Sequence, residues 1–128
     1  MTTGANPGLI KNYDAEAAIT PHRIVKFGTA DAAVIPAAAV GDLLIGVSNL
    51  LGAAITDRVD ITKSGIAQVE FGATVVRGAP LTTDSVGRAV TAAPATGVNN
   101  SIIGYAEVSG VVGDIGSVFI APGSMQGA

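Results

Sequence analysis

Short runs of alternating apolar and polar residues recur along the chain, and a glycine, proline or aspartate follows most of them. The clearest are 58–62 (RVDIT) and 66–71 (IAQVEF). Because side chains of a strand point alternately to its two faces, such runs predict half-buried β-strands. The predicted strands cover residues 22–27, 34–35, 43–47, 58–62, 66–71, 102–108 and 117–120, together with the two arms of a hairpin within 81–90.

The hairpin within 81–90 has the clearest turn signal. Asp84 can accept a hydrogen bond from its own backbone two residues on, and Gly87 can take a left-handed conformation. With the strands on either side, the pattern predicts an all-β protein, a small β-barrel or sandwich of about eight or nine short strands. Pro36 lacks a backbone donor, so the strand at 34–35 lies at an edge or stops there. The alanines at 37–39 fit either one helical turn or a tightly packed segment.

The two ends of the chain read differently from its middle. Glycine and proline interrupt residues 1–20, which we therefore predict to be an extended N-terminal arm; residues 21–123 form the β domain and 124–128 a flexible C-terminal tail. Leu9, Ile10 and Tyr13 are isolated apolar residues of this arm, and we expect them to contact a partner or a sister protomer. Two alternatives stay open: a short helix through these residues, and an arm that folds back on its own barrel.

A weak internal repeat has an offset of 58 residues. The segment 44–47 (LIGV) matches 102–105 (IIGY), and Gly52, Ile61 and Gly65 correspond to Gly110, Phe119 and Gly123. Either the two units pair across a pseudo-twofold axis in one barrel, or the match is a coincidence in a chain rich in glycine and isoleucine.

Composition narrows the class of protein. The chain has 128 residues, a length that fits one domain with a single core. It contains 22 Ala, 15 Val and 12 Ile but only 6 Leu, and this excess of β-branched residues over leucine argues against a leucine-rich helical bundle. Ten acidic against seven basic residues give a net charge of −3, so we expect no nucleic-acid partner. Apolar stretches are far shorter than the roughly 20 residues of a membrane span, and the N-terminus lacks signal-peptide features. We therefore expect no membrane partner, and synthesis in the cytoplasm.

Candidate chemistry is sparse. The chain has no cysteine, and its one histidine, His22, lacks a second histidine for a zinc site. Asp57, Asp60 and Asp84 are conceivable ligands of a hard cation, but turn formation explains them more simply. Cofactor motifs are missing, and the three phenylalanines are expected in the core. We predict no enzyme activity, no cofactor and no metal.

In its order of motifs the chain resembles the capsid cement, or head decoration, proteins of tailed bacteriophages. The resemblance spans about four fifths of the chain, from His22 to Gly123. It departs from the family at Ala32 and Thr56, where the family has glycine, and at Ala79, where it has aspartate; these turn types stay open. The matching segments are LIGVS (44–48), RVDI (58–61), SGIAQV (64–69), RGAPLTTD (77–84), GRAV (87–90), IGYA (103–106), and Gly113-Asp114 before a strand that ends at Pro122-Gly123.

This resemblance implies a structural virion protein on the outer surface of an icosahedral phage head. Such a protein binds the major capsid protein, bridges its subunits and stabilises the expanded shell, often as a homotrimer. The residues themselves leave one alternative of another class, a stand-alone small β-barrel that binds a small molecule or a glycan.

Overall fold

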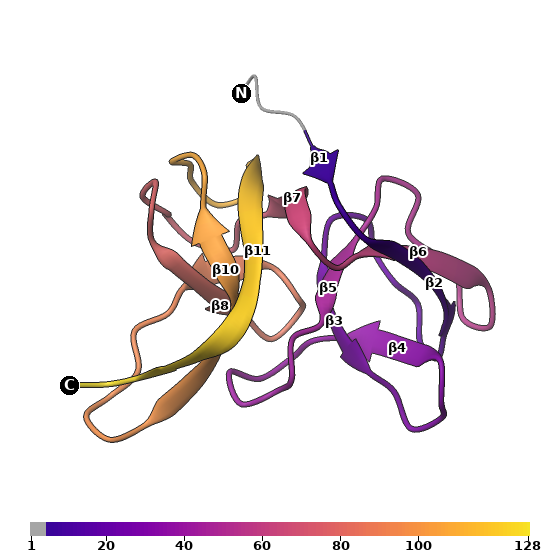
Figure 1. The fold of residues 1–128 in the computed structure, drawn as a ribbon, viewed down its shortest axis with the longest axis horizontal. Helices are drawn as coiled ribbons and strands as arrows, with labels where there is room; N and C mark the ends of the chain where they lie inside the picture. The colour runs from indigo at the N-terminus through magenta and orange to yellow at the C-terminus, as the bar shows by residue number, and fades with distance from the viewer. Residues whose placement is uncertain (1–4) are drawn as a thin grey trace.

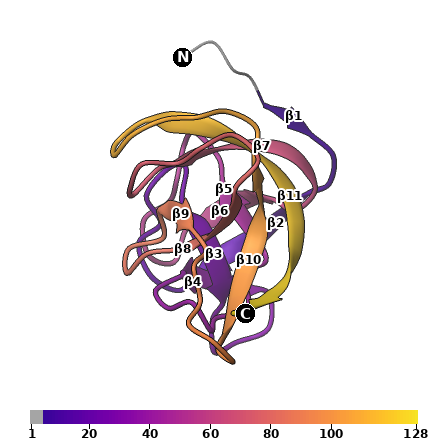
Figure 2. The ribbon, with the colours of Figure 1, turned by 90° about the vertical axis from the view of Figure 1, so that its left-hand side faces the viewer.

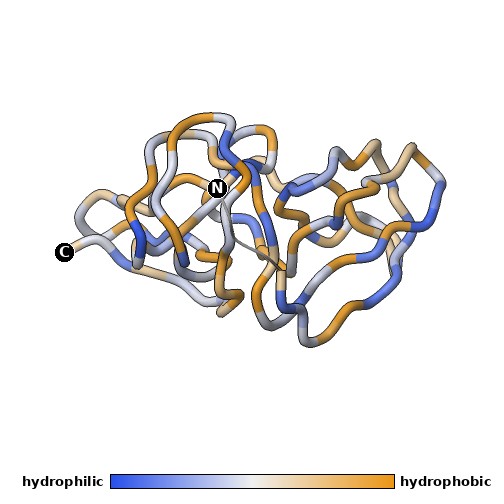
Figure 3. The backbone as a smooth tube through the Cα atoms, turned by 90° about the horizontal axis from the view of Figure 1, so that it is seen from above, coloured by the Kyte–Doolittle hydropathy of each residue, from blue (hydrophilic) through white to orange (hydrophobic). Residues whose placement is uncertain are grey.

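The computed structural model describes residues 5–128, and every regular element in that range is a β-strand (Figure 1). The strands form two lobes, a closed five-stranded barrel and a six-stranded sheet. Figure 3 shows the lobes side by side, with hydrophobic segments in both. The strands are β1 (Asn6–Pro7), β2 (Ile10–Ala15), β3 (Ile24–Phe27), β4 (Ala33–Pro36), β5 (Gly46–Ser48), β6 (Arg58–Thr62), β7 (Gly65–Glu70), β8 (Pro80–Thr83), β9 (Ala89–Thr91), β10 (Asn99–Ala106) and β11 (Ile115–Gln126).

The barrel contains strands β2 to β6 in the order β2-β4-β3-β5-β6. All pairs are antiparallel except β2 with β4, which run parallel with Asp14 opposite Ala33. Apolar side chains fill the interior, as expected for so small a barrel. These buried residues are Tyr13, Ala15, Ile19, Val25, Val34, Ile45, Val59 and Ile61.

The second lobe is an antiparallel sheet in the order β1-β7-β11-β10-β8-β9 (Figure 2). Its long central pair, β10 and β11, runs from Asn99 opposite Gln126 to Ala106 opposite Val118. One face of this sheet packs on the barrel and forms a second, larger core around Phe71, which is fully buried. The expectation of a single core is therefore wrong.

Strands β3 and β5 lie between the two cores. Val25 of β3 points into the barrel, while its neighbour Ile24 belongs to the core shared with the sheet. Val47 of β5 also belongs to this shared core. A strand covered on both faces needs no polar alternation, which explains the consecutive apolar residues in these segments.

The structure differs from the sequence prediction at both ends of the chain. The predicted arm belongs to the body within the described residues, because β1 pairs with β7, and β2 is a barrel strand between β4 and β6. For residues 5–20 the structure agrees with the alternative that the sequence left open, in which this segment folds back on its own barrel. Residues 1–4 of the predicted arm lie outside the described range. The predicted tail at 124–128 is also wrong, since Ser124 to Gln126 pair with β10 and Gly127 bridges Thr96.

The turn predicted at Asp84 and Gly87 is confirmed, and the structure shows the backbone conformation at two positions that the sequence left open. Asp84 Oδ1 accepts hydrogen bonds from the Val86 and Arg88 N–H groups, and Gly87 has a φ of 84°. Ala32 and Thr56, which stand where the resembled family has glycine, have φ values of 62° and 74°. Because a side chain is strained in this left-handed region, the structure gives a physical reason for glycine at both positions.

The internal repeat corresponds to one antiparallel strand pair in each lobe, rather than two pairs in one barrel. Its first unit contains β5 and β6, and its second contains β10 and β11. One pair of repeated glycines, Gly46 and Gly104, shares a role, since each of the two approaches the backbone of the neighbouring strand. A Cβ on Gly46 would lie 2.5 Å from the Thr62 carbonyl oxygen, and one on Gly104 would overlap that of Phe119.

Candidate functional site

The three predicted contact residues separate into two environments. Leu9 and Ile10 are 56% and 48% exposed, whereas Tyr13 is only 3% exposed in the barrel interior. Leu9 is held in place by its backbone, whose N–H donates to Ser64 Oγ at 2.7 Å and whose carbonyl accepts the Lys63 N–H at 2.8 Å. Leu9 and Ile10 are thus available for contact, while Tyr13 is a core residue and cannot form a surface contact.

The outer face of the six-stranded sheet carries an apolar row that the sequence analysis missed. Tyr105 of β10 lies opposite Phe119 of β11, and Phe119 lies opposite Ile66 of β7. Tyr105 and Phe119 are 42% and 48% exposed, since their neighbours Ala106 and Val118 occupy the buried face. Register thus joins side chains 14 residues apart in sequence into one exposed surface.

Only one of the three phenylalanines lies in the core, contrary to the prediction. Phe71 is fully buried, whereas Phe27 and Phe119 are each about half exposed. Alternation identified which residues share a face, but it cannot say which face another element covers. Further large apolar side chains are exposed in loops: Leu43, Leu50, Leu51, Ile55, Val76, Val111 and Val112.

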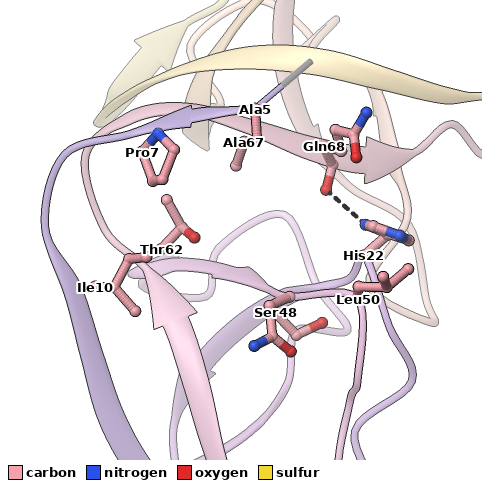
Figure 4. Close-up of a pocket in the computed structure, with 10 residues that line it drawn as sticks. Ala5, Pro7, Ile10, His22, Ser48, Leu50, Thr62, Ala67 and Gln68 are labelled. Atoms are coloured by element: carbon pink, nitrogen blue, oxygen red, sulfur yellow. Dashed lines mark hydrogen bonds between the residues drawn. The ribbon is translucent and has the colours of Figure 1, made fainter. Parts of the chain in front are cut away.

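A cavity of about 190 Å³ opens at the junction of the two lobes (Figure 4). Its walls are mainly apolar and come from β1, from the start of β2, from β5 and the loop after it, from β6 and from β7. They include Pro7, Ile10, Leu50, Thr62 and Ala67. His22 closes one side, with its Nδ1 3.2 Å from the Gln68 carbonyl oxygen. This bond ties the ring to the backbone of β7, which supports a structural role for the histidine.

Charged side chains tie the two lobes together. Arg23, just before β3, bonds Glu70 of β7 at 3.2 Å and donates to the Val86 carbonyl at 2.9 Å. Arg88 joins the same group through Glu70 and through Asp84, whose Oδ2 lies 2.8 Å from Arg88 Nε. The Arg23–Glu70 ion pair joins the barrel to the sheet, whereas the two ion pairs of Arg88 lie within the sheet lobe and hold Glu70 in place.

Glu16 organises the loop between β3 and β4. Its carboxylate accepts hydrogen bonds from the Thr29 N–H at 2.9 Å, from the Thr29 hydroxyl at 3.0 Å and from the Ala30 N–H at 3.2 Å. The Thr29 N–H is the largest cause that lowers the pKa of Glu16 below its ordinary value of 4.5, and desolvation opposes the shift. The ionised carboxylate therefore stabilises this loop.

Within residues 5–128 the structure brings together no group of three or more histidine or acidic side chains that could hold a metal ion. Asp84 is occupied in its turn, and Asp60 Oδ1 accepts from Asn12 Nδ2 at 2.9 Å. In the same range no helix has the length and apolar character to cross a membrane. Exposed apolar surface is thus the main candidate feature that the fold presents.

These features define a class of architecture, a small all-β protein with a filled barrel, a companion sheet and exposed apolar residues on both. The same fold is found in the crystal structure of the N base of head fiber gp8.5 in bacteriophage phi29, with a TM-score of 0.67. The match covers 88% of this chain and 93% of that chain at 20% sequence identity, so it shows a shared fold. No protein-family model and no curated protein matches the chain.

Proposed function

We propose that the protein is a non-catalytic structural component of a phage virion, bound to the outer surface of the head. The observation that carries this proposal is the fold shared, over nearly the full length of both chains, with the base of a phage head fiber. The residue pattern supports it independently, since its ordered motifs resemble those of capsid cement proteins.

The proposed action is mechanical. The protein bridges subunits of the major capsid protein and stabilises the expanded shell, because it binds that lattice better than the unexpanded one. As a homotrimer it would engage the shell at three linked places, and the second and third contacts would be intramolecular. Individual interfaces near the usual size of about 1,600 Å² would then suffice.

Two exposed apolar surfaces supply the contacts in this proposal. Leu9 and Ile10 form the first, beside the cavity at the junction of the lobes. Tyr105 and Phe119 form the second, on the open sheet face. Aromatic side chains are enriched at protein interfaces, where burial of their large apolar area stabilises association.

The alternative, a barrel that binds a small molecule or a glycan, gains little from the structure. The side chains of the barrel core, with Tyr13, Val34 and Ile61 among them, occupy its interior. A ligand would therefore have to bind outside the barrel, at a surface cavity such as the one beside Ile10.

The proposal is tested by light scattering after size exclusion, followed by co-sedimentation with expanded and unexpanded shells of the phage that encodes the chain. We expect a trimer that sediments with expanded shells at a fixed copy number. Leu9→Ser/Ile10→Ser should weaken this binding, whereas Val111→Ser/Val112→Ser, an adjacent and similarly exposed pair in the loop before β11, should not. A monomer that binds neither shell would overturn the proposal.

A further inference from the structure

Two lysines converge on one buried aromatic ring at the barrel. Lys63, directly after β6, donates from Nζ to the Tyr13 hydroxyl at 2.7 Å. Lys11 of β2 places its Nζ 4.3 Å from the centroid of the same ring, and the Nζ of Lys63 lies 5.3 Å from it. The two ammonium groups are therefore less than about 10 Å apart, within one Debye length at 0.1 M salt.

Neither lysine has a carboxylate partner among residues 5–128. The ion pairs in this range use Arg23, Lys26, Arg58 and Arg88. The nearest acidic residues of the same two strands are Asp14 and Asp60, and strand alternation places them on the opposite face from Lys11. There they bind Arg58 and Asn12, at 2.7 Å and 2.9 Å respectively.

Contacts with Tyr13 hold both ammonium groups in place, through the ring for Lys11 and through the ring and the hydroxyl for Lys63. Tyr13 is buried although its neighbours on the strand, Lys11 and Asn12, are exposed, which is consistent with lysine stems that cover the ring. A lysine that is already ordered loses less side-chain entropy when it binds an anion. The described part of the chain thus presents two preorganised positive charges that form no ion pair within it.

We propose that Lys11 and Lys63 form a docking site for the carboxylates of an acidic protein segment. Binding of such a segment requires only the charges and contacts described above. Identification of the segment as part of a capsid subunit rests on the proposed function. Charge complementarity defines the occupant, since two adjacent unpaired cations favour a partner that carries two nearby carboxylates.

Apolar surface beside the lysines favours a protein segment over a nucleic acid. Phe27 is 48% exposed, and its ring centroid lies 6.0 Å from Lys63 Nζ. Leu9, whose carbonyl accepts the Lys63 N–H, is also exposed. A segment with acidic and apolar side chains can use both features, while the net charge of −3 repels a long polyanion such as DNA.

The test is a titration of the full chain with an acetylated hexaglutamate peptide at pH 7 and low salt, followed by NMR and calorimetry. Hexaserine, inorganic phosphate and a short single-stranded DNA are titrated in parallel. We expect the glutamate peptide to shift the signals of Lys11, Lys63, Tyr13 and Phe27, and binding to vanish at about 1 M salt, where the Debye length is about 3 Å.

Charge-removing variants sharpen the test. Lys11→Gln/Lys63→Gln should bind the peptide about two- to thirtyfold more weakly, the range expected when two exposed charge pairs are lost. Lys26→Gln is the control, because this lysine of barrel strand β3, which pairs with β4 and β5, already forms an ion pair with Asp42 at 3.1 Å. Urea denaturation verifies that each variant is folded. The NMR signal shifts of the unmodified protein locate the peptide without any variant, so they test the inference even if a variant fails to fold.

Three results would overturn the inference: signal shifts that map elsewhere, equal binding by the double variant, or tighter binding of DNA or phosphate than of the peptide. Co-sedimentation separates it from the proposed function. Shell binding that survives Lys11→Gln/Lys63→Gln rejects the inference and leaves the function standing. Failure of the unmodified protein to bind shells rejects the function, and the peptide titration still decides the inference.

Discussion

Glycine at Thr56 should stabilise the protein, although the substitution removes a side chain. Thr56 has a φ of 74°, in the left-handed region that is unfavourable for β-branched residues. Its N–H donates to the Ala15 carbonyl at 2.8 Å, a bond that glycine preserves, and its side chain is exposed. The substitution therefore relieves backbone strain without the loss of a buried contact.

The expected size follows from two opposing contributions. The left-handed conformation costs an L-residue about 1–2 kcal/mol, which glycine recovers. Glycine also loses about 0.4–1 kcal/mol through the greater freedom of the unfolded chain. We therefore expect Thr56→Gly to raise the free energy of unfolding by about 0.5–1 kcal/mol, or the Tm by about 2–4 °C for a chain of this size.

Two control variants isolate the backbone effect. Gly78 has a φ of 90°, and a Cβ there would meet no heavy atom within 4 Å, so Gly78→Ala adds only the strain and should destabilise by about 0.5–1 kcal/mol. Ala54 is exposed and lacks a positive φ, so Ala54→Gly should destabilise by about 0.4–1 kcal/mol.

Urea denaturation followed by circular dichroism measures all three variants, with unchanged m-values as the check that only the stability differs. Thr56→Gly should therefore have the opposite sign to Gly78→Ala and Ala54→Gly, which both destabilise by similar amounts. A Thr56→Gly protein as destabilised as Ala54→Gly would refute the argument from backbone strain.

Two further predictions concern the larger core and the loop between β3 and β4. Phe71→Ala should lower the free energy of unfolding by about 3–5 kcal/mol in urea denaturation, and Phe71→Leu by clearly less, because the buried ring packs against Gly110 and Gly116; equal losses would contradict this packing. For Glu16, a lowered pKa in the folded state means that its stabilisation is complete above pH 4.5 and is lost as the pH falls through the folded pKa. Glu16→Gln should therefore reduce the loss of stability between neutral pH and acid, and an unchanged pH profile would show that ionisation of Glu16 does not stabilise the fold.

Local residue patterns were enough to predict the secondary-structure class and much of the local geometry. Alternation at 58–62 and 66–71 predicted β6 and β7, and the β8–β9 turn follows the predicted chemistry of Asp84 and Gly87. These features depend on residues close together in the chain, so their physics is local.

Which face of each strand is covered depends on long-range packing that the residue patterns do not reveal. Alternation could not distinguish Phe71, enclosed between sheet and barrel, from Phe119, on the open face, because both sit in similar strand patterns. The same holds for the predicted arm, whose segment around Tyr13 became a barrel strand once β4 and β6 supplied its hydrogen bonds. The site of the two lysines also depends on pairing between β2 and β6, which joins residues about 50 positions apart. Burial and proximity of this kind arise from long-range strand register, which local residue patterns do not encode.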